Sequence, residues 1–163
     1  TLNGATLRPG EEQSEIVDPE HLAILTTGPL SMTGGTVALD LVNATPGSGH
    51  DQLVVNGTVA LNAPTLQINV PGPIPAIGTS FVIVANDGTD PVAGIFAGLP
   101  EGTVFTADGT SLRITYLGGS GNDVVLIVVP APASNVEQVP TLSTWMMLLL
   151  TLTLAAIGLR MRG

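Results

Sequence analysis

Short apolar or alternating runs follow one another along the chain, and each is bounded by Gly, Pro, Asn or Asp. Runs of about four to eight residues between such turn formers are typical of β-strands rather than of helices. The pattern therefore predicts an all-β body over residues 1–129. The predicted strands are a short one within 2–10, and then 22–27, 35–42, 52–55, 58–61, 65–70, 80–85, 112–116 and 124–129.

One of these runs occurs twice. Gly35-Thr-Val-Ala-Leu-Asp40 returns as Gly57-Thr-Val-Ala-Leu-Asn62, an offset of 22 residues (35 to 57). A β-solenoid coil has about this length, and the inward side chains of one coil stack on those of the next. The alternative is a chance recurrence of similar turns, with a β-sandwich as the alternative fold. The stacked pairs that the alignment predicts are Val37 on Val59 and Leu39 on Leu61.

The end of the chain has a different texture. Residues 146–159 carry no charge, are rich in Leu and Met, and have Thr151 and Thr153 as their only polar side chains. No helical spacing gives this stretch the polar face that a surface helix of a globular protein has. Extended back to Val139, it approaches the roughly 20 residues that a membrane-spanning helix needs. We therefore expect one C-terminal transmembrane helix within 139–163.

The flanks of this stretch agree with a membrane location. Trp145 is of a type found at membrane interfaces, and Arg160 and Arg162 fit the cytoplasmic side under the positive-inside rule. Residues 130–138 contain two prolines and several small residues, which keep a linker extended. The predicted organisation is a body at 1–129, a linker at 130–138 and a membrane-directed tail at 139–163.

A more specific pattern precedes the apolar stretch. Val139-Pro-Thr-Leu-Ser143 with Trp145, then an apolar helix and a basic end, resembles the IPTL-type C-terminal sorting signal. Gram-negative bacteria carry this signal on exported proteins that are handled by an exosortase, a membrane-embedded cysteine protease. Val139 replaces the usual Ile, while Thr144 and Met146 replace the frequent Glu and Gly. The resemblance implies a transient membrane anchor. It assigns recognition to Val139, Pro140, Thr141, Leu142, Ser143 and Trp145, with Arg160 and Arg162 flanking the membrane.

The body carries a second resemblance. Segments 5–10, 24–28, 50–57, 86–92, 96–102 and 116–126 resemble the end of autotransporter-type β-helix passenger proteins. This implies the last coils of a right-handed parallel β-helix, with a more antiparallel C-terminal cap from about Thr79 onward. The acidic segment 11–20 departs from the short turn usual there, and the tail replaces an outer-membrane barrel, so self-translocation is not implied. Because the chain starts at Thr1 without a signal peptide, we expect the C-terminal part of a longer exported protein.

Composition excludes several function classes. The chain has no Lys and only four Arg against 13 acidic residues, a net charge of −9, so it lacks the basic surface that nucleic acids require. The absence of Cys excludes disulfides, thiol catalysis and Cys-based zinc sites. An acidic, Lys-free surface instead suits an exported, extracellular body.

The candidates for catalysis are few. His50 and Asp51 are the only neighbouring His–carboxylate pair, but adjacent residues of a strand point to opposite faces, and the sequence identifies no partner for His21. Asp40 aligns with Asn62 in the repeated run, so the stacked carboxylates of a β-helix glycosidase are not supplied. A Ser nucleophile elbow and a metal-binding His pair are also missing from the sequence. We expect no enzyme activity and assign no catalytic residue.

One turn resembles a metal-binding motif. Gly118-Gly-Ser-Gly-Asn-Asp123 is similar to a single calcium-binding nonapeptide repeat. Calcium takes about six to eight oxygen ligands, so one copy does not complete a site even if Asp87, Asp90 and Asp108 contribute. A Gly-rich turn before the last strand is the simpler interpretation. Asp123 is kept as a candidate calcium ligand, and no other cofactor is expected.

Together these observations predict a non-enzymatic, exported β-protein of the cell surface or extracellular matrix, with an adhesin-like display role. One alternative is a self-assembling filament or matrix subunit, because open coil ends are unpaired strand edges. Another is the C-terminal part of a β-helix enzyme that acts on polysaccharide, with its active site upstream. The expected partners are the membrane through the tail, an exosortase-type enzyme, and either further copies of the chain or surface polysaccharide.

Overall fold

The computed structural model describes residues 1–10 and 21–133 of the chain. The chain divides into two units, Thr1–Pro132 and Ala133–Gly163. Every regular element of the described residues is a strand, which confirms the predicted all-β class. In chain order the strands are β1 (Leu2–Asn3), β2 (Thr6–Leu7), β3 (Ile24–Thr27), β4 (Leu30–Thr33), β5 (Thr36–Asp40), β6 (Gln52–Val55), β7 (Val59–Asn62), β8 (Thr65–Asn69), β9 (Ser80–Asn86), β10 (Ala93–Ile95), β11 (Val104–Ala107), β12 (Thr110–Gly118) and β13 (Asp123–Val128).

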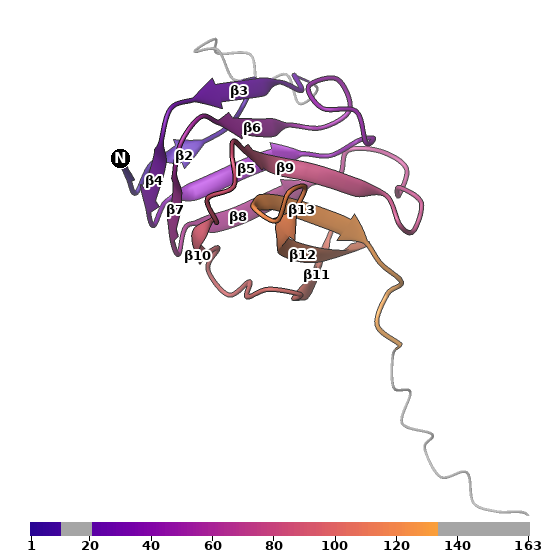
Figure 1. Cartoon of the computed structure of the whole chain (residues 1–163). Helices are drawn as coiled ribbons and strands as arrows, with labels where there is room; N and C mark the ends of the chain where they lie inside the picture. The colour runs from indigo at the N-terminus through magenta and orange to yellow at the C-terminus, as the bar shows by residue number, and fades with distance from the viewer. Residues whose placement is uncertain (11–20, 134–163) are drawn as a thin grey trace, which may run out of the picture. The chain divides into compact units, whose positions relative to one another are not determined.

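The strands up to β10 form three parallel stacks (Figure 1). The chain passes through β1, β2 and β3, each in a different sheet, and then repeats this order with β4–β6 and β7–β9. We call one passage through the three sheets a circuit. The stacks are β1–β4–β7–β10, β2–β5–β8 and β3–β6–β9, and every strand pair within them is parallel. A β-sandwich, by contrast, is built from antiparallel sheets.

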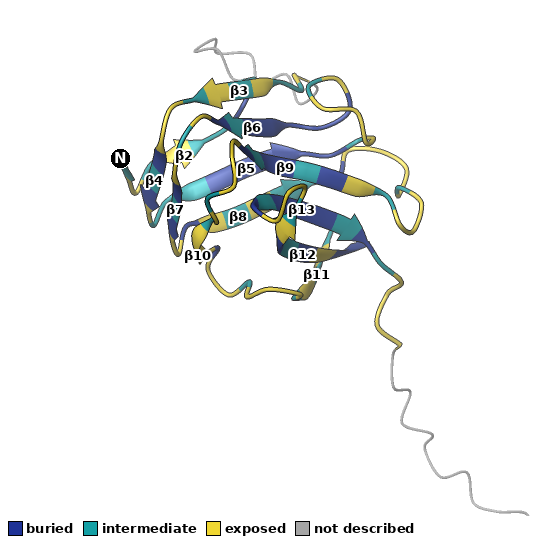
Figure 2. Cartoon of the chain, viewed as in Figure 1, coloured by how far each residue is buried: buried dark blue, intermediate teal, exposed yellow. Residues whose placement is uncertain are grey.

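Each sheet carries an inward ladder of apolar side chains. Because side chains alternate along a strand, in-register parallel pairing places like positions above one another. The middle residue of each ladder is completely buried, and the core lies between the three sheets (Figure 2). The ladders are Leu2–Met32–Leu61, Leu7–Val37–Leu66 and Leu25–Leu53–Val84.

The stacking predicted from the repeated run is wrong. Its first copy forms β5 and its second copy forms β7, which lie in different sheets. Val37 pairs with Leu66 rather than with Val59. Asp40 pairs with Asn69, 29 residues further along the chain, and not with Asn62. One circuit is therefore longer than the repeated run indicates.

The two copies of the repeated run share a tight turn at a glycine just before a strand, which we call a corner. Gly35 precedes β5 with a φ of 76°, and Gly57 precedes β7 with a φ of 117°. Such positive φ values favour glycine, because a Cβ atom meets the backbone there. At Gly35 that Cβ would also collide with the backbone oxygen of Ala5 in the neighbouring circuit. The repeated run thus marks a corner followed by a strand, which occurs at two different places in the circuit.

Antiparallel strands cover the end of the stack opposite to β1–β3. β13 pairs with β9, β12 pairs with β13, and β11 pairs with β12. Their residues Leu112, Ile114 and Leu126 are completely buried, and the rings of Phe96 and Tyr116 lie 6.4 Å apart between centroids. The cap that we expect from about Thr79 is thus formed by β11–β13, whereas β9 and β10 still pair in parallel with β6 and β7.

Two neighbours on β7 test which face of this strand belongs to the core. Leu61 is buried there, whereas Ala60 is half-buried beside Ser31 and Ala93. Leu61→Asp should lower the unfolding free energy by about 3 kcal/mol or more, because it buries an unpaired charge. Ala60→Asp should cost about 1 kcal/mol or less. Thermal unfolding of residues 1–132, followed by circular dichroism, measures both. Equal losses would contradict a one-sided strand.

Candidate functional site

The predicted recognition and membrane-flanking residues lie outside the described residues. In the described part of the chain, no helix is long and apolar enough to cross a membrane. The sorting signal and its helix therefore stay predictions, and the polar clusters described below all belong to the body. The residues concerned are Val139, Pro140, Thr141, Leu142, Ser143, Trp145, Arg160 and Arg162.

Three consecutive buried polar side chains stand at the start of β6. His50, Asp51 and Gln52 are all buried, and Asp51 has 0% of its surface exposed. We call these three residues the β6 polar cluster. Since an unpaired polar group in the interior costs free energy, the hydrogen-bond partners of these side chains decide what they do.

Asp51 connects three segments of the chain. Its Oδ1 accepts a hydrogen bond from Ala23 N at 2.8 Å, and its Oδ2 accepts one from Asp40 N at 2.9 Å. Ala23 precedes β3, and Asp40 ends β5. Burial raises the pKa of the Asp51 carboxyl above its ordinary value of 3.8; the Asp40 charge adds to this shift, while the two hydrogen bonds and Arg8 oppose it. The carboxyl group is thus an acceptor for two backbone amides.

His50 and Gln52 also bind the backbone. His50 Nδ1 lies 3.1 Å from Asn43 O and Nε2 lies 3.3 Å from Val82 O, to which Gln52 Nε2 donates at 2.8 Å. The imidazole ring packs edge-on against Phe81, with 5.4 Å between ring centroids. The imidazole faces carbonyl groups and the neighbouring carboxylate faces amides, so the geometry of the β6 polar cluster supports a structural role and not a catalytic dyad.

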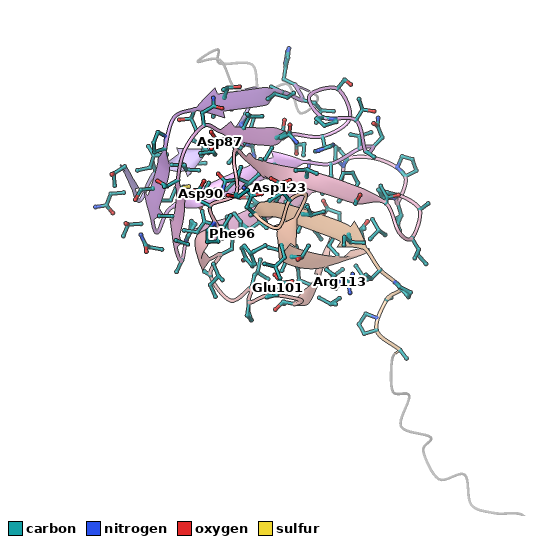
Figure 3. The ribbon with its side chains drawn as sticks, in the orientation of Figure 1. Asp87, Asp90, Phe96, Glu101, Arg113 and Asp123 are labelled. Atoms are coloured by element: carbon teal, nitrogen blue, oxygen red, sulfur yellow. The ribbon has the colours of Figure 1, made fainter. Side chains whose placement is uncertain are left out.

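A second polar cluster joins the end of β9 to the start of β13 (Figure 3). We call Asn86, Asp87, Asp90, Asn122 and Asp123 the Asn86 turn cluster. Asp123 Oδ1 accepts a hydrogen bond from Asn86 N at 2.9 Å, and Asn122 Nδ2 donates to Asp87 O at 3.0 Å. The candidate calcium ligand Asp123 therefore already holds the last amide of β9.

The acidic residues singled out in the sequence are only partly brought together. Asp87, Asp90 and Asp123 belong to the Asn86 turn cluster, whereas Asp108 Oδ2 accepts a hydrogen bond from Val70 N at 2.8 Å. Within residues 1–10 and 21–133, no group of three or more His, Asp or Glu side chains is arranged to hold a metal ion. A metal site at this turn would thus need neutral oxygens as well as carboxylates.

Neither asparagine of this cluster is assigned a role by the sequence pattern. Asn86 and Asn122 are both buried, and their side-chain amides bind backbone carbonyl groups of the turn. The available signal is an Asn-Asp pair next to Gly at each place, since Asn often binds the backbone in turns. Exposed apolar side chains in the loop 71–78 are a further feature that was not predicted: Ile74 and Ile77 are 64% and 69% exposed.

No match is found when the chain is compared with protein-family models, with curated proteins and with solved structures. Its function is therefore inferred from its own contacts and sequence patterns. The β6 polar cluster makes structural hydrogen bonds to the backbone. The Asn86 turn cluster gathers carboxylate and amide oxygens in one turn of the described body.

Asp51→Asn tests the structural role of the carboxyl group. An amide side chain has one acceptor oxygen, so one of the two backbone amides at Ala23 and Asp40 faces an NH₂ group instead. We expect a loss of about 1–3 kcal/mol in the free energy of unfolding at pH 7, measured with denaturant. Asp108→Asn removes one carboxylate from an exposed turn and should cost less than about 1 kcal/mol.

The same variant has a predictable pH dependence. The pKa of Asp51 is raised in the folded state, so the folded protein binds this proton more tightly than the unfolded chain does. The contribution of Asp51 to the free energy of unfolding is therefore fully present below about pH 3.8 and is lost as the pH rises through the raised pKa. Asn does not titrate and lacks this slope. The penalty of Asp51→Asn should therefore be larger at pH 4 than at pH 7, and a penalty that grows with pH would contradict the raised pKa.

Proposed function

We propose that this chain is the C-terminal end of a right-handed parallel β-helix on an exported, non-enzymatic protein of the cell surface or extracellular matrix. Its role is adhesin-like display of a stiff β-body, and its tail is a sorting signal read by an exosortase-type enzyme. The three parallel stacks and the repeated circuit support the β-helix. Solenoids of this kind bury each repeat against its neighbours.

The observation that carries the proposal is the difference between the two ends of the stack. Among residues 1–10 and 21–133, β1, β2 and β3 are each the last strand of their sheet, so in this part of the chain the first circuit has unpaired edges in all three sheets. Its inward residues Leu2, Leu7 and Leu25 are only half-buried. The opposite end carries the antiparallel cap. One open end and one capped end suit the terminal coils of a longer stack.

The order of the chain connects this asymmetry to display. β13 is the last strand of the cap, and the linker and the tail follow it in the sequence. The capped end is therefore the part of the body that is tethered to the tail, and the open end is left to carry further coils. The structural partners of His50 and Asp51 support the non-enzymatic part of the proposal.

The sorting signal predicts a defined C-terminus for the mature protein. In a Gram-negative host that carries an exosortase, the chain placed behind a secretion signal should reach the surface without residues 146–163. Mass spectrometry of the surface protein should find an end between Thr141 and Trp145. Pro140→Ala alters the recognition block and should retain the tail, whereas Thr153→Ala in the apolar stretch should be processed normally. Surface protein that still contains Arg162 would overturn the sorting signal.

The unpaired edges also favour a second candidate, self-assembly. Two copies can meet through their open ends. At the capped end, antiparallel strands continue the third sheet and, among the described residues, leave only β8 and β10 as parallel edges, so that end does not match the three edges that a head-to-tail filament needs. Electron microscopy of the full chain in a mild detergent should therefore show single particles or pairs. Filaments that lengthen with protein concentration would favour the matrix-subunit alternative over display.

A further inference from the structure

Asn86 has an acceptor oxygen without a donor. The residue is only 8% exposed, and its Oδ1 is buried and receives no hydrogen bond. One contact fixes the direction of the side-chain amide, because Nδ2 donates to Asp90 O at 2.8 Å. The backbone N of Asn86 is held separately and donates to Asp123 Oδ1 at 2.9 Å. Rotating the amide by half a turn would place Oδ1 against the carbonyl oxygen of Asp90. Oδ1 is therefore held in its place inside the turn.

Asp90 supplies a second oxygen of the same kind. Its Oδ2 is buried and also has no hydrogen-bond partner, although the backbone oxygen of this residue binds Asn86 Nδ2. A buried carboxylate oxygen without a donor or a positive charge is costly. Two such acceptors in one short turn would be stabilised by a group that offers positive charge or hydrogen-bond donors.

The surroundings indicate a cation. Asp87 and Asp123 belong to the same cluster and add negative charge, while Figure 3 shows Arg113 apart from all three aspartates. The oxygens of Asn86 and Asp90 are an amide and a carboxylate, which together with carbonyl groups and water are the ligands that calcium prefers. Magnesium demands stricter octahedral geometry and keeps most of its water, so it suits this irregular turn less well.

We propose that Asn86 Oδ1 and Asp90 Oδ2 bind a calcium ion in the turn that follows β9. No three acidic or histidine side chains of the described residues converge here, so neutral oxygens complete the ion's shell. Few charged ligands mean weak binding, in the range of about 10⁻⁴–10⁻³ M found for extracellular modules. This inference is independent of the display function, because it rests on the turn alone.

Calcium titration of the full chain in a mild non-ionic detergent tests the site. After removal of metal with EDTA, isothermal titration calorimetry should show saturable uptake of one calcium ion per chain, and calcium should raise the melting temperature. Magnesium should bind at least tenfold more weakly. Absence of saturable uptake, or equal affinity for the two ions, would overturn the proposal.

Two variants of equal charge locate the ion. Asp90→Asn removes the charge of the proposed ligand and should weaken calcium binding at least tenfold. Asp108→Asn removes the same charge at an exposed turn where the carboxylate accepts a bond from Val70 N, and should bind as the wild type. Circular dichroism checks that both variants fold. If both bind calcium like the wild type, or if both lose it equally, the assignment to Asn86 and Asp90 is wrong.

Discussion

A circuit of this body is stable only where a neighbouring circuit covers its inward side chains. The second circuit has a neighbour on each side, and its residues Met32, Val37 and Leu53 are completely buried. The cap strands cover part of the third circuit and bury Ile83 together with Ile114, while Leu66 on β8 stays half-buried. The first circuit has no such cover among the described residues, which explains why its ladder residues are only half-buried.

The positions of most strands were predictable, but their arrangement in space was not. Apolar runs between turn formers located Gln52–Val55 and placed Ser80–Asn86 to within one residue. The circuit length stayed hidden because the connections differ: residues 34–35 join β4 to β5, whereas 41–51 join β5 to β6. Connections of unequal length hide the number of residues in one circuit. The repeated corner instead suggested a period of 22 residues, which is not the length of a circuit. Very short strands such as Ala93–Ile95, which contains a glycine, gave no signal in the sequence.

The two polar clusters show why the role of a residue is harder to predict than its position. Asp51 and its neighbour His50 were visible as a pair, but their partners are far away in the sequence. Asp51 binds Ala23, 28 residues earlier, and His50 faces Val82, 32 residues later. Only the stacking of circuits brings these groups together. Without knowledge of which strands pair and in what register, the sequence alone does not distinguish a carboxylate that is fully hydrogen-bonded from one that is free to react.

What separates the clusters is whether the acceptors have donors. Both oxygens of the Asp51 carboxyl receive backbone amides, whereas Asn86 Oδ1 and Asp90 Oδ2 receive none. The difference follows from position, because the Asn86 turn cluster lies where the parallel stack gives way to the antiparallel cap. Backbone amides in a regular ladder have fixed partners, but a turn between two kinds of pairing leaves oxygens that no strand can serve. An ion held by Asn86 and Asp90 would stabilise the turn after β9, beside the backbone amide of Asn86, from which Asp123 at the start of β13 already accepts a hydrogen bond.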